Sequence, residues 1–423
     1  MNVLYLIHRY SQTFGGAERY IHTIAQRMAA EGHSVTIYTS NVVDIEGFWK
    51  RGKRRVPAED SSHKGVRVRC FQARVLPLHS YLCYLLSRVP WDAVGLALAP
   101  PGFVLPGLWR AVVSERGFGL VHAAAYPSLM YLGAIAAHRS GARLVLMPCT
   151  HPGAYGDDAQ RRYFLSPRMV HLYNRADAVI ALTNLERQTL IQAGVVAERV
   201  YVTGVGVDPK ASQGADPARF RQAYGLSTAT PVVAFIGHKT EGKGALHLLD
   251  ACEQLLADRL NLVVAMLGER TDVFRQRYRK LPSEVRARVL DLVGLSEAEK
   301  HDLLAASSVL VLPSKDDSFG IVLLEAWLHR IPVIGARAGG VPDVIQDGVT
   351  GLLVPYGDKS ALVRALSFLL DHPDEAAAMG QRGWDIAGQR WTWEAVFARV
   401  SAIYERVIAS RGAFLAAPAR EPN

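Results

Sequence analysis

Short apolar runs alternate with segments of helical periodicity along this 423-residue chain, and the alternation occurs twice. Such runs, bounded by Gly, Pro and polar residues, are typical of strands that are buried on both faces of a parallel sheet. Two consecutive doubly wound α/β sheets fit this pattern better than one large sheet. The expected strands are Val3–Ile7, Ser34–Tyr38, Val66–Phe71, Leu120–His122, Arg143–Met147, Ala178–Leu182 and Arg199–Val202 in the first set, and Val232–Ile236, Leu262–Leu267, Val289–Val293, Val309–Leu312, Val333–Gly335 and Leu352–Val354 in the second.

The segment between the two sets predicts a linker, because it concentrates residues that interrupt helices and strands. These residues are Pro209, Gly214, Pro217, Gly225 and Pro231. We therefore expect an N-terminal Rossmann-like domain at residues 1–208 and a second one at 209–385. A C-terminal helix is expected within 386–410, with Thr392 as its N-cap, and a disordered tail at 411–423.

Charge is distributed unevenly between the two halves. The formal net charge is +9, and residues 1–208 hold 23 Lys and Arg against 14 Asp and Glu, whereas residues 209–423 hold 25 of each kind. A basic half beside a neutral one argues against a general nucleic-acid-binding protein and favours an anionic lipid or glycan as partner of the first half. The basic run at 50–55 and the Leu-, Pro- and aromatic-rich stretch at 75–113 fit two readings: a solvated loop with a buried helix pair, or a peripheral membrane surface.

The sequence also bears on the compartment. The first residues form a strand-like run that is too short and too poor in basic residues for a secretory signal. The longest uncharged apolar stretch, 93–109, contains three prolines and is too short to cross a membrane. The four cysteines are scattered, which argues against a zinc site or a disulfide framework. We expect a cytoplasmic protein that associates peripherally, if at all, with the inner face of the cytoplasmic membrane.

The segment PSKDDSFGIVLLEA, from Pro313 to Ala326, carries the strongest chemical signal. A buried strand ends at Pro313, a polar turn follows, and a helix opens near Gly320, where unpaired N–H groups and the helix dipole favour a diphosphate. Asp317 and Glu325 could then accept hydrogen bonds from different hydroxyl groups of one ligand. The alternative is an N-terminal charge and an exposed helical Glu. Because Glu325 stands among apolar residues, however, it needs a buried partner.

Two glycine-rich loops add to this signal, one in each half of the chain. Gly15-Gly16 follows the first strand, and FIGHKTEGKG, from Phe235 to Gly244, follows the first strand of the second set. Lys243, between two glycines, can direct a compact positive charge at a phosphate leaving group. A nicotinamide or flavin enzyme is disfavoured, because the G-x-G-x-x-G fingerprint and the acidic residue after the second strand are both absent.

In this order, the motifs resemble those of the family 4 glycosyltransferases, which are retaining, use nucleotide sugars and have the GT-B fold, in which two Rossmann-like domains face each other across a cleft. The match covers nearly the whole chain. Four further segments carry the resemblance: GHSVT at Gly32–Thr36, GVGVD at Gly204–Asp208, AGGVPD at Ala338–Asp343 and GVTGLLV at Gly348–Val354. In this family the C-terminal helix crosses back to the first domain.

The resemblance implies a role for each matching residue. Glu325 would bind the nucleotide ribose, and Asp317 would bind the transferred sugar. The base would lie near Leu295, and His151, at the end of a strand of the first domain, would lie near the sugar and the acceptor. The remaining donor contacts would come from the backbone of Phe319 and Gly320 at the sugar, and from the amides of Ile321 and Val322, Lys243, His238 and Gly16 at the diphosphate.

Two of these positions depart from the family pattern. Asp317 stands where Glu is usual, and His238 stands where the family generally has an Arg, which makes that charge dependent on pH unless Lys239 replaces it.

The roles that the resemblance implies give three expected catalytic residues, which are His151, Asp317 and Lys243. No metal and no cofactor besides the nucleotide sugar is expected, because no Asp-x-Asp site is visible and cationic side chains are present.

The predicted function is that of a hexosyltransferase of the EC 2.4 class. It would move a sugar from a nucleoside diphosphate to a glycan or lipid-linked acceptor in the synthesis of cell-surface polysaccharide or glycolipid. The donor would lie mainly on residues 209–385 and the acceptor on the basic half. Two alternatives stay open: a nucleotide-sugar epimerase on the same architecture, and a homologue that binds sugar nucleotides with weakened catalysis.

Overall fold

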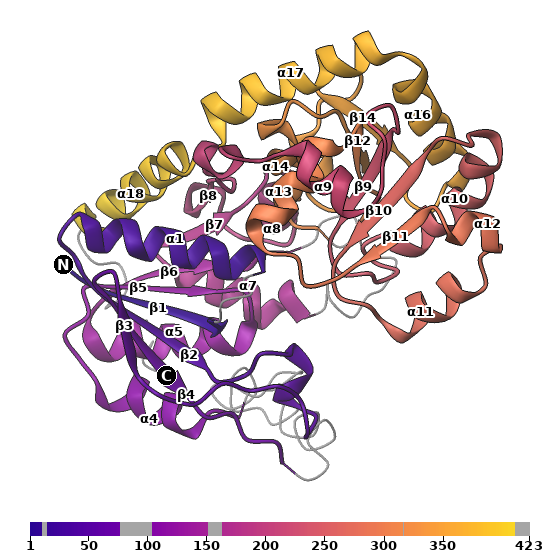
Figure 1. The fold of residues 1–423 in the computed structure, drawn as a ribbon. Helices are drawn as coiled ribbons and strands as arrows, with labels where there is room; N and C mark the ends of the chain where they lie inside the picture. The colour runs from indigo at the N-terminus through magenta and orange to yellow at the C-terminus, as the bar shows by residue number, and fades with distance from the viewer. Residues whose placement is uncertain (11–14, 77–103, 151–162, 316, 411–423) are drawn as a thin grey trace. The chain divides into compact units, whose positions relative to one another are not determined.

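The computed structural model describes residues 1–10, 15–76, 104–150, 163–315 and 317–410, and its chain forms two compact units. Among these residues, unit 1 takes those up to Thr150, those from 163 to Thr203 and those from Phe397 onwards, and unit 2 takes those from Gly204 to Val396. The chain thus passes from one unit to the other just before the GVGVD segment, whereas the sequence places the domain boundary after it. Each unit is a twisted sheet flanked by helices (Figure 1).

Unit 1 is built on an eight-stranded sheet in the order β3-β4-β2-β1-β5-β6-β7-β8. All neighbouring strands are parallel except β3 and β4. All the strands predicted for the first half of the chain are present. The sequence misses β3, which contains only Ser and His and adds to the edge of the sheet. The strands are β1 (Asn2–Arg9), β2 (Ser34–Ser40), β3 (Ser61–His63), β4 (Val66–Phe71), β5 (Leu120–Ala124), β6 (Arg143–Met147), β7 (Ala178–Ala181) and β8 (Val200–Val202).

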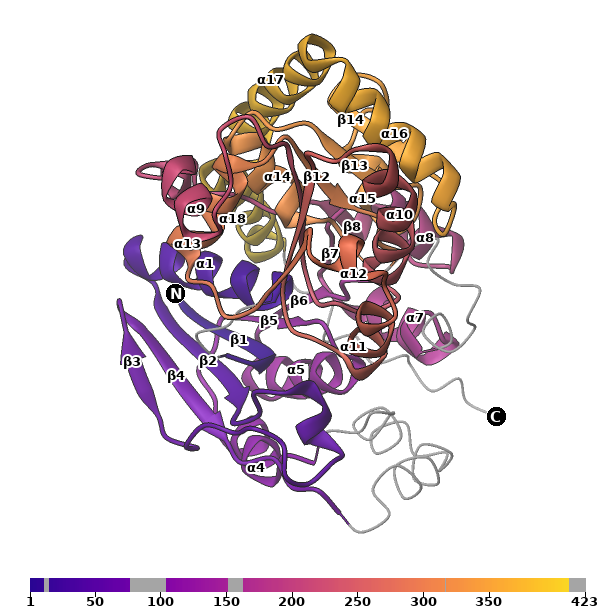
Figure 2. The ribbon, with the colours of Figure 1, turned by 45° about the vertical axis from the view of Figure 1, so that its right-hand side comes forward.

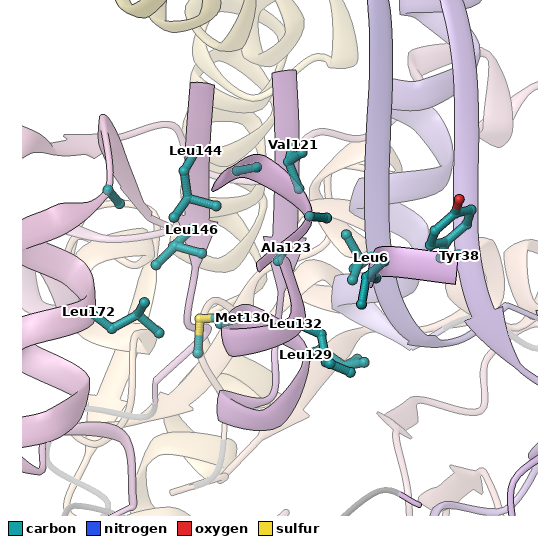
Figure 3. Close-up of a cluster of buried hydrophobic side chains, with 14 of the residues drawn as sticks. Leu6, Tyr38, Val121, Ala123, Leu129, Met130, Leu132, Leu144, Leu146 and Leu172 are labelled. Carbon is teal, nitrogen blue, oxygen red and sulfur yellow. The ribbon is translucent and has the colours of Figure 1, made fainter. Parts of the chain in front are cut away.

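The helices of unit 1 cover both faces of this sheet, with α1 and α5 on opposite sides (Figures 1 and 2). The core on the α5 side is apolar, and in Figure 3 Leu129, Met130 and Leu132 lie beside side chains of β5 and β6. Gly133 allows this close packing, because a Cβ there would lie 2.5 Å from the Cβ of Ala123. The helices are α1 (Gly16–Ala30), α4 (Pro106–Ser114), α5 (Pro127–Ser140), α7 (Pro167–Arg175) and α8 (Asn184–Gln192).

The last helix, α18 (Trp393–Ala409), begins as predicted with Thr392, whose Oγ1 accepts a hydrogen bond of 3.2 Å from the Ala395 amide. From Phe397 onwards the helix belongs to unit 1. There the hydroxyl of Tyr404 lies 2.7 Å from Nδ1 of His122 in β5. Burial lowers the pKa of His122 to about 3, so this contact involves a neutral ring.

Unit 2 contains a six-stranded parallel sheet in the order β11-β10-β9-β12-β13-β14, which confirms all the strands predicted for the second half. They are β9 (Val232–Ile236), β10 (Val263–Leu267), β11 (Val289–Leu292), β12 (Val309–Leu312), β13 (Val333–Ala336) and β14 (Gly351–Val354). The helices are α9 (Pro217–Ala223), α10 (Ala245–Asp258), α11 (Asp272–Arg279), α12 (Ser283–Arg286), α13 (Glu297–Ala306), α14 (Ile321–Leu328), α15 (Val341–Val344), α16 (Lys359–Asp371) and α17 (Pro373–Arg390).

Candidate active site

The strand order of unit 2 determines where a ligand can bind. β9 and β12 are neighbours, but the chain leaves β9 toward β10 and leaves β12 toward β13, in opposite directions along the sheet. In open α/β sheets, ligands bind at such a switch point, beyond the carboxyl ends of the strands. The two loops that begin here, 237–244 after β9 and 313–320 after β12, carry the residues of the second half that the sequence assigns to the diphosphate and the sugar.

These two loops touch through their backbones. Gly244 has φ +76°, and a Cβ on it would lie only 2.0 Å from the carbonyl oxygen of Pro313. The carbonyl of Gly242 accepts hydrogen bonds from the amide of Lys315 at 2.9 Å and from the hydroxyl of Ser314 at 3.2 Å. Gly244 of the GKG segment is therefore required for the approach of one loop to the other, beyond any contact with a phosphate.

A third loop supports the second one from the side of β13. The amide of Gly340 donates a 2.7 Å hydrogen bond to the carbonyl of Asp317. A Cβ on Gly339, whose φ is +60°, would lie 2.3 Å from the same carbonyl oxygen. The two glycines of the AGGVPD segment thus hold the backbone of Asp317, which explains why this segment accompanies the PSKDDSFG turn in the sequence.

Lys243 and Asp317, which the resemblance assigns to the diphosphate and to the sugar, form an ion pair. The Lys243 ammonium lies 2.8 Å from Oδ1 of Asp317, and both side chains are partly buried. The residues are 74 positions apart in the chain. The contact joins the cation of one loop to the carboxylate of the other at the switch point.

Helix α14 begins at this place with a residue in the left-handed conformation. Gly320 has φ +85°, and a Cβ there would come within 3.0 Å of the side chains of Leu312 and Leu323. Phe319 is buried with its ring 5.2 Å from the ring of Trp391, which anchors the turn. The amides of Ile321 and Val322 follow in the first turn, where the N–H groups of a helix have no intrahelical acceptor.

Glu325, in the second turn of α14, is buried, as its apolar neighbours in the sequence indicate. Its partner is Lys300 of α13, whose ammonium lies 2.9 Å from Oε1 of Glu325. Sequence reasoning predicts that a partner exists but misses Lys300. A usable signal was present, since Lys300 lies three and four residues before Leu303 and Leu304, both of them buried, and so on the apolar face of α13.

The neighbouring residues His238 and Lys239 have opposite environments. Lys239 is fully buried, pairs with Asp291 and donates a 2.7 Å hydrogen bond to the carbonyl of Leu292 at the end of β11. Burial lowers the pKa of Lys239. The ammonium of Lys239 thus binds residues of β11, whereas the side chain of His238 is exposed.

Leu295, expected beside the base, is half-buried and immediately precedes the N-cap Ser296 of α13.

Two family models match the chain, one in each half. Residues 15–206 match the glycosyl transferase 4-like domain, and residues 216–385 match the glycosyl transferases group 1. The chain belongs to glycosyltransferase family 4. Its fold is the GT-B fold: the structure of HepE from Anabaena, solved in complex with UDP and glucose, superposes with a TM-score of 0.71 at 21% identity over 96% of this chain and 100% of that one.

Two curated relatives of this chain carry named activities. A D-inositol 3-phosphate glycosyltransferase from Corynebacterium glutamicum is 33% identical over 252 residues, which cover 56% of this chain and 59% of that protein. An alpha-maltose-1-phosphate synthase from Mycobacterium tuberculosis is 28% identical over 256 residues, which cover 55% of this chain and 64% of that protein. The chain thus spans about three-fifths of the length of these two relatives.

In unit 1, the glycine-rich loop is linked to β1 by a buried carboxylate. Glu18 lies 3.1 Å from Nε2 of His8 and also pairs with Arg9. Burial opposes ionisation of Glu18, but the charges and hydrogen bonds of His8 and Arg9 outweigh it and lower the pKa to about 2. A Cβ on Gly15 would lie 2.6 Å from Oε2 of Glu18, whereas Gly16 is exposed as the first residue of α1.

His151, the remaining predicted catalytic residue, lies outside the described residues. Its neighbour Thr150 is described, and its amide and hydroxyl donate hydrogen bonds of 2.6 and 3.0 Å to Oε1 of Glu186. Oε2 of Glu186 accepts a 2.7 Å hydrogen bond from the amide of Leu182. This fully buried carboxylate, which sequence reasoning missed, joins the chain beyond β6 to the chain beyond β7.

Part of the basic run at 50–55 is paired within unit 1, where two carboxylates face three of its five cations. Lys50 and Lys53 pair with Glu46, and Arg54 pairs with Asp44. Arg55 donates hydrogen bonds to the carbonyls of Gly47 and Ala73. Most of the stretch at 75–113 lies outside the described residues. In the part of the chain that is described, no helix is long and apolar enough to cross a bilayer, and no group of three or more His, Cys, Asp or Glu could hold a metal ion.

Proposed function

We propose that this protein transfers a glycosyl group from a nucleoside diphosphate sugar bound on unit 2 to an acceptor bound on unit 1. The observation that carries the proposal is the convergence, at the switch point of unit 2, of the Lys243–Asp317 ion pair, the first turn of α14 and the buried Glu325. A diphosphate, a sugar and a ribose each have a suitable partner within these two loops and one helix.

The diphosphate would be bound by the amides of Ile321 and Val322 and by Lys243, which together provide positive charge where negative charge develops on the leaving group. A phosphate would compete with Asp317 for the Lys243 ammonium. The carboxylate of Asp317 would then accept hydrogen bonds from hydroxyl groups of the sugar. Because this charge is provided by the chain itself, we expect turnover without an added divalent metal.

For the reaction we propose substitution with retention of configuration. The bond between the anomeric carbon and the diphosphate oxygen breaks, and the acceptor oxygen forms its bond to the same face of the sugar through an oxocarbenium-like state. The proton of the acceptor hydroxyl passes to the leaving phosphate oxygen. The resemblance supports this step, in which Asp317 binds the sugar and Glu325 binds the ribose.

The acceptor that we propose is a glycan or lipid-linked intermediate of cell-surface polysaccharide or glycolipid synthesis. Support comes from the basic character of residues 1–208. Both curated relatives are named for sugar phosphates or inositol phosphates, which are likewise anionic.

Donor binding provides the first test, because a ligand that binds only the folded state raises the melting temperature. We expect one class among UDP-, GDP- and ADP-sugars to stabilise the protein. Glu325→Ala should lower the affinity for that ligand about tenfold or more, because hydrogen bonds to a charged group are lost. The matched control is Glu375→Ala, because Glu375 is an exposed residue of α17. Unchanged donor affinity in Glu325→Ala would show that the assignment of this site is wrong.

Turnover then separates the candidate activities. Release of nucleotide only when an acceptor is present supports transfer, and an isomerised donor without release supports an epimerase. Binding without either product supports a homologue with weakened catalysis, the outcome that Asp317 and His238 make worth testing.

We also propose that unit 1 binds an anionic membrane surface. The ion pairs within the basic run at 50–55 reduce the positive charge that is available for this binding. Binding to vesicles that contain phosphatidylglycerol is expected to weaken as the salt concentration rises from about 50 to about 500 mM, because salt screens the attraction between exposed charges. Arg51→Glu with Lys50→Glu should weaken it further, whereas Lys280→Glu in unit 2 should not. Absence of binding at the lowest salt in a co-sedimentation assay would refute this part of the proposal.

A further inference from the structure

Lys300 occupies an unusual position for a lysine. It is 7% exposed, and its ammonium lies between two carboxylates, 2.9 Å from Oε1 of Glu325 and 2.7 Å from Oε2 of Glu297. The two carboxylates differ in environment, since the side chain of Glu325 is 8% exposed and that of Glu297 is 69% exposed. Lysine is rarely buried to this degree unless it is paired, and here the buried partner is the carboxylate proposed to bind the ribose.

Lys300 places a positive charge directly against the buried carboxylate of Glu325. The neighbours of Glu325 in α14, Leu324 and Ala326, are buried and apolar, as is Trp327. A carboxylate in such surroundings takes up a proton unless a cation compensates it. Removing one partner of a buried pair leaves the other charge uncompensated. A protonated Glu325 would lose much of its strength as an acceptor, because hydrogen bonds to an ionised group are the stronger ones.

The pair also fixes the orientation of the carboxylate. The hydrogen bond from Lys300 to Oε1 connects the second turn of α14 to α13, whose first turn is closed by a capping box between Ser296 and Glu299. Lys300 thus projects from a helix start with its own stable geometry. The contact with Glu297, three residues earlier in α13, holds the lysine side chain on the same helix.

We propose that Lys300 is a positioning residue for ribose recognition: it keeps Glu325 ionised and oriented, so that Glu325 accepts hydrogen bonds from the ribose hydroxyls of the donor. The inference rests on the proposed function, in which Glu325 binds that ribose. It goes further, because the discrimination of ribose hydroxyls then depends on Lys300, a residue of another helix that acts through Glu325.

The test compares each variant with two ligands. Dissociation constants are measured by calorimetry for UDP, GDP and ADP, and then for the 2′,3′-dideoxy counterpart of whichever diphosphate binds. In the wild type, removal of both hydroxyls is expected to weaken binding about 10- to 100-fold. In Lys300→Met, the affinity for the ribose form should fall by a similar factor while the dideoxy form is hardly affected, so the ratio of the two constants approaches one.

Two further variants separate this role from a structural one. Lys300→Arg keeps the charge and should retain most of the ratio, and Lys280→Met removes an exposed lysine of the same unit and should leave the ratio unchanged. A merely structural effect would weaken both ligands equally and preserve the ratio. If Lys300→Met does not fold, Lys300→Gln, which can still donate a hydrogen bond to Glu325, is measured in its place and is expected to lose part of the ratio.

The outcomes are distinguishable. A wild-type ratio in folded Lys300→Met, or in folded Lys300→Gln where the Met variant fails, overturns the inference and leaves the proposed function standing. If none of the three diphosphates binds the wild type, the proposed function itself fails. A ratio near one in the wild type shows that Glu325 does not contact the ribose, which overturns the inference and relocates the ribose site.

Discussion

Gly244→Ala is expected to destabilise unit 2 by about 3 kcal/mol or more and to abolish detectable donor binding. A non-glycine residue at a φ of +76° costs about 1–2 kcal/mol by itself. The added Cβ would lie 2.0 Å from the carbonyl oxygen of Pro313, so backbone must move apart, and with it the loops that carry Lys243 and Asp317. Urea unfolding measures the first effect, and the thermal shift caused by the donor measures the second.

The control for this variant is Gly225→Ala. Gly225 has a comparable φ of +65°, but no atom lies within 4 Å of the Cβ that alanine would add. Only the conformational cost, about 1 kcal/mol, should appear there, with normal donor binding. Equal losses of stability in the two variants would contradict the close approach of the 237–244 and 313–320 loops.

Glu186→Gln is expected to remove a pH dependence from the stability of unit 1. Burial raises the pKa of Glu186 from 4.5 to about 7 in the folded protein. A carboxyl group whose pKa is raised by folding stabilises the folded state below its unfolded pKa, and this contribution is lost as the pH rises through the folded pKa. The loss between pH 4.5 and pH 7 amounts to up to about 3 kcal/mol.

The measurement is the free energy of unfolding in urea at pH 5, 6, 7 and 8 for the wild type, Glu186→Gln and the control Glu405→Gln, since Glu405 is exposed on α18. The wild type should lose stability relative to Glu186→Gln as the pH rises, and the control should follow the wild type. In the native protein the amides of Thr150 and Leu182 donate hydrogen bonds to the two oxygens of Glu186. The NH2 group of Gln would face one of these amides as a second donor, so we expect Glu186→Gln to lose some stability by an amount that does not change with pH. Parallel curves for the wild type and Glu186→Gln would refute the prediction.

Local patterns in the sequence determined much of this protein. Among the described residues, apolar runs predict every strand except β3, because burial on both faces of a parallel sheet requires continuous apolar residues. The single strand that they miss has no apolar residue and lies at an edge. The PSKDDSFG turn likewise predicts the start of α14, because a strand end, a polar turn and a glycine are all signals within one short stretch.

The partners of the charged side chains were decided by the tertiary structure. Lys300 meets Glu325 across 25 residues, Lys239 meets Asp291 across 52, and Lys243 meets Asp317 across 74. In each pair the spacing in the chain carries no signal, because the order of the strands brings the two residues together. Lys239 illustrates the consequence: its sequence position allows it to replace the missing arginine, but folding buries it against β11.

The sequence by itself thus determined the two α/β units, the loops of the candidate site and the family, because each of these follows from residues that are close together in the chain. The tertiary structure alone decided which carboxylates in those loops are paired and which glycines are required by the approach of one backbone to another. The physical reason is that periodicity and turn residues act locally, whereas burial and ion pairing depend on distances that exist only once β9, β12 and β13 lie side by side.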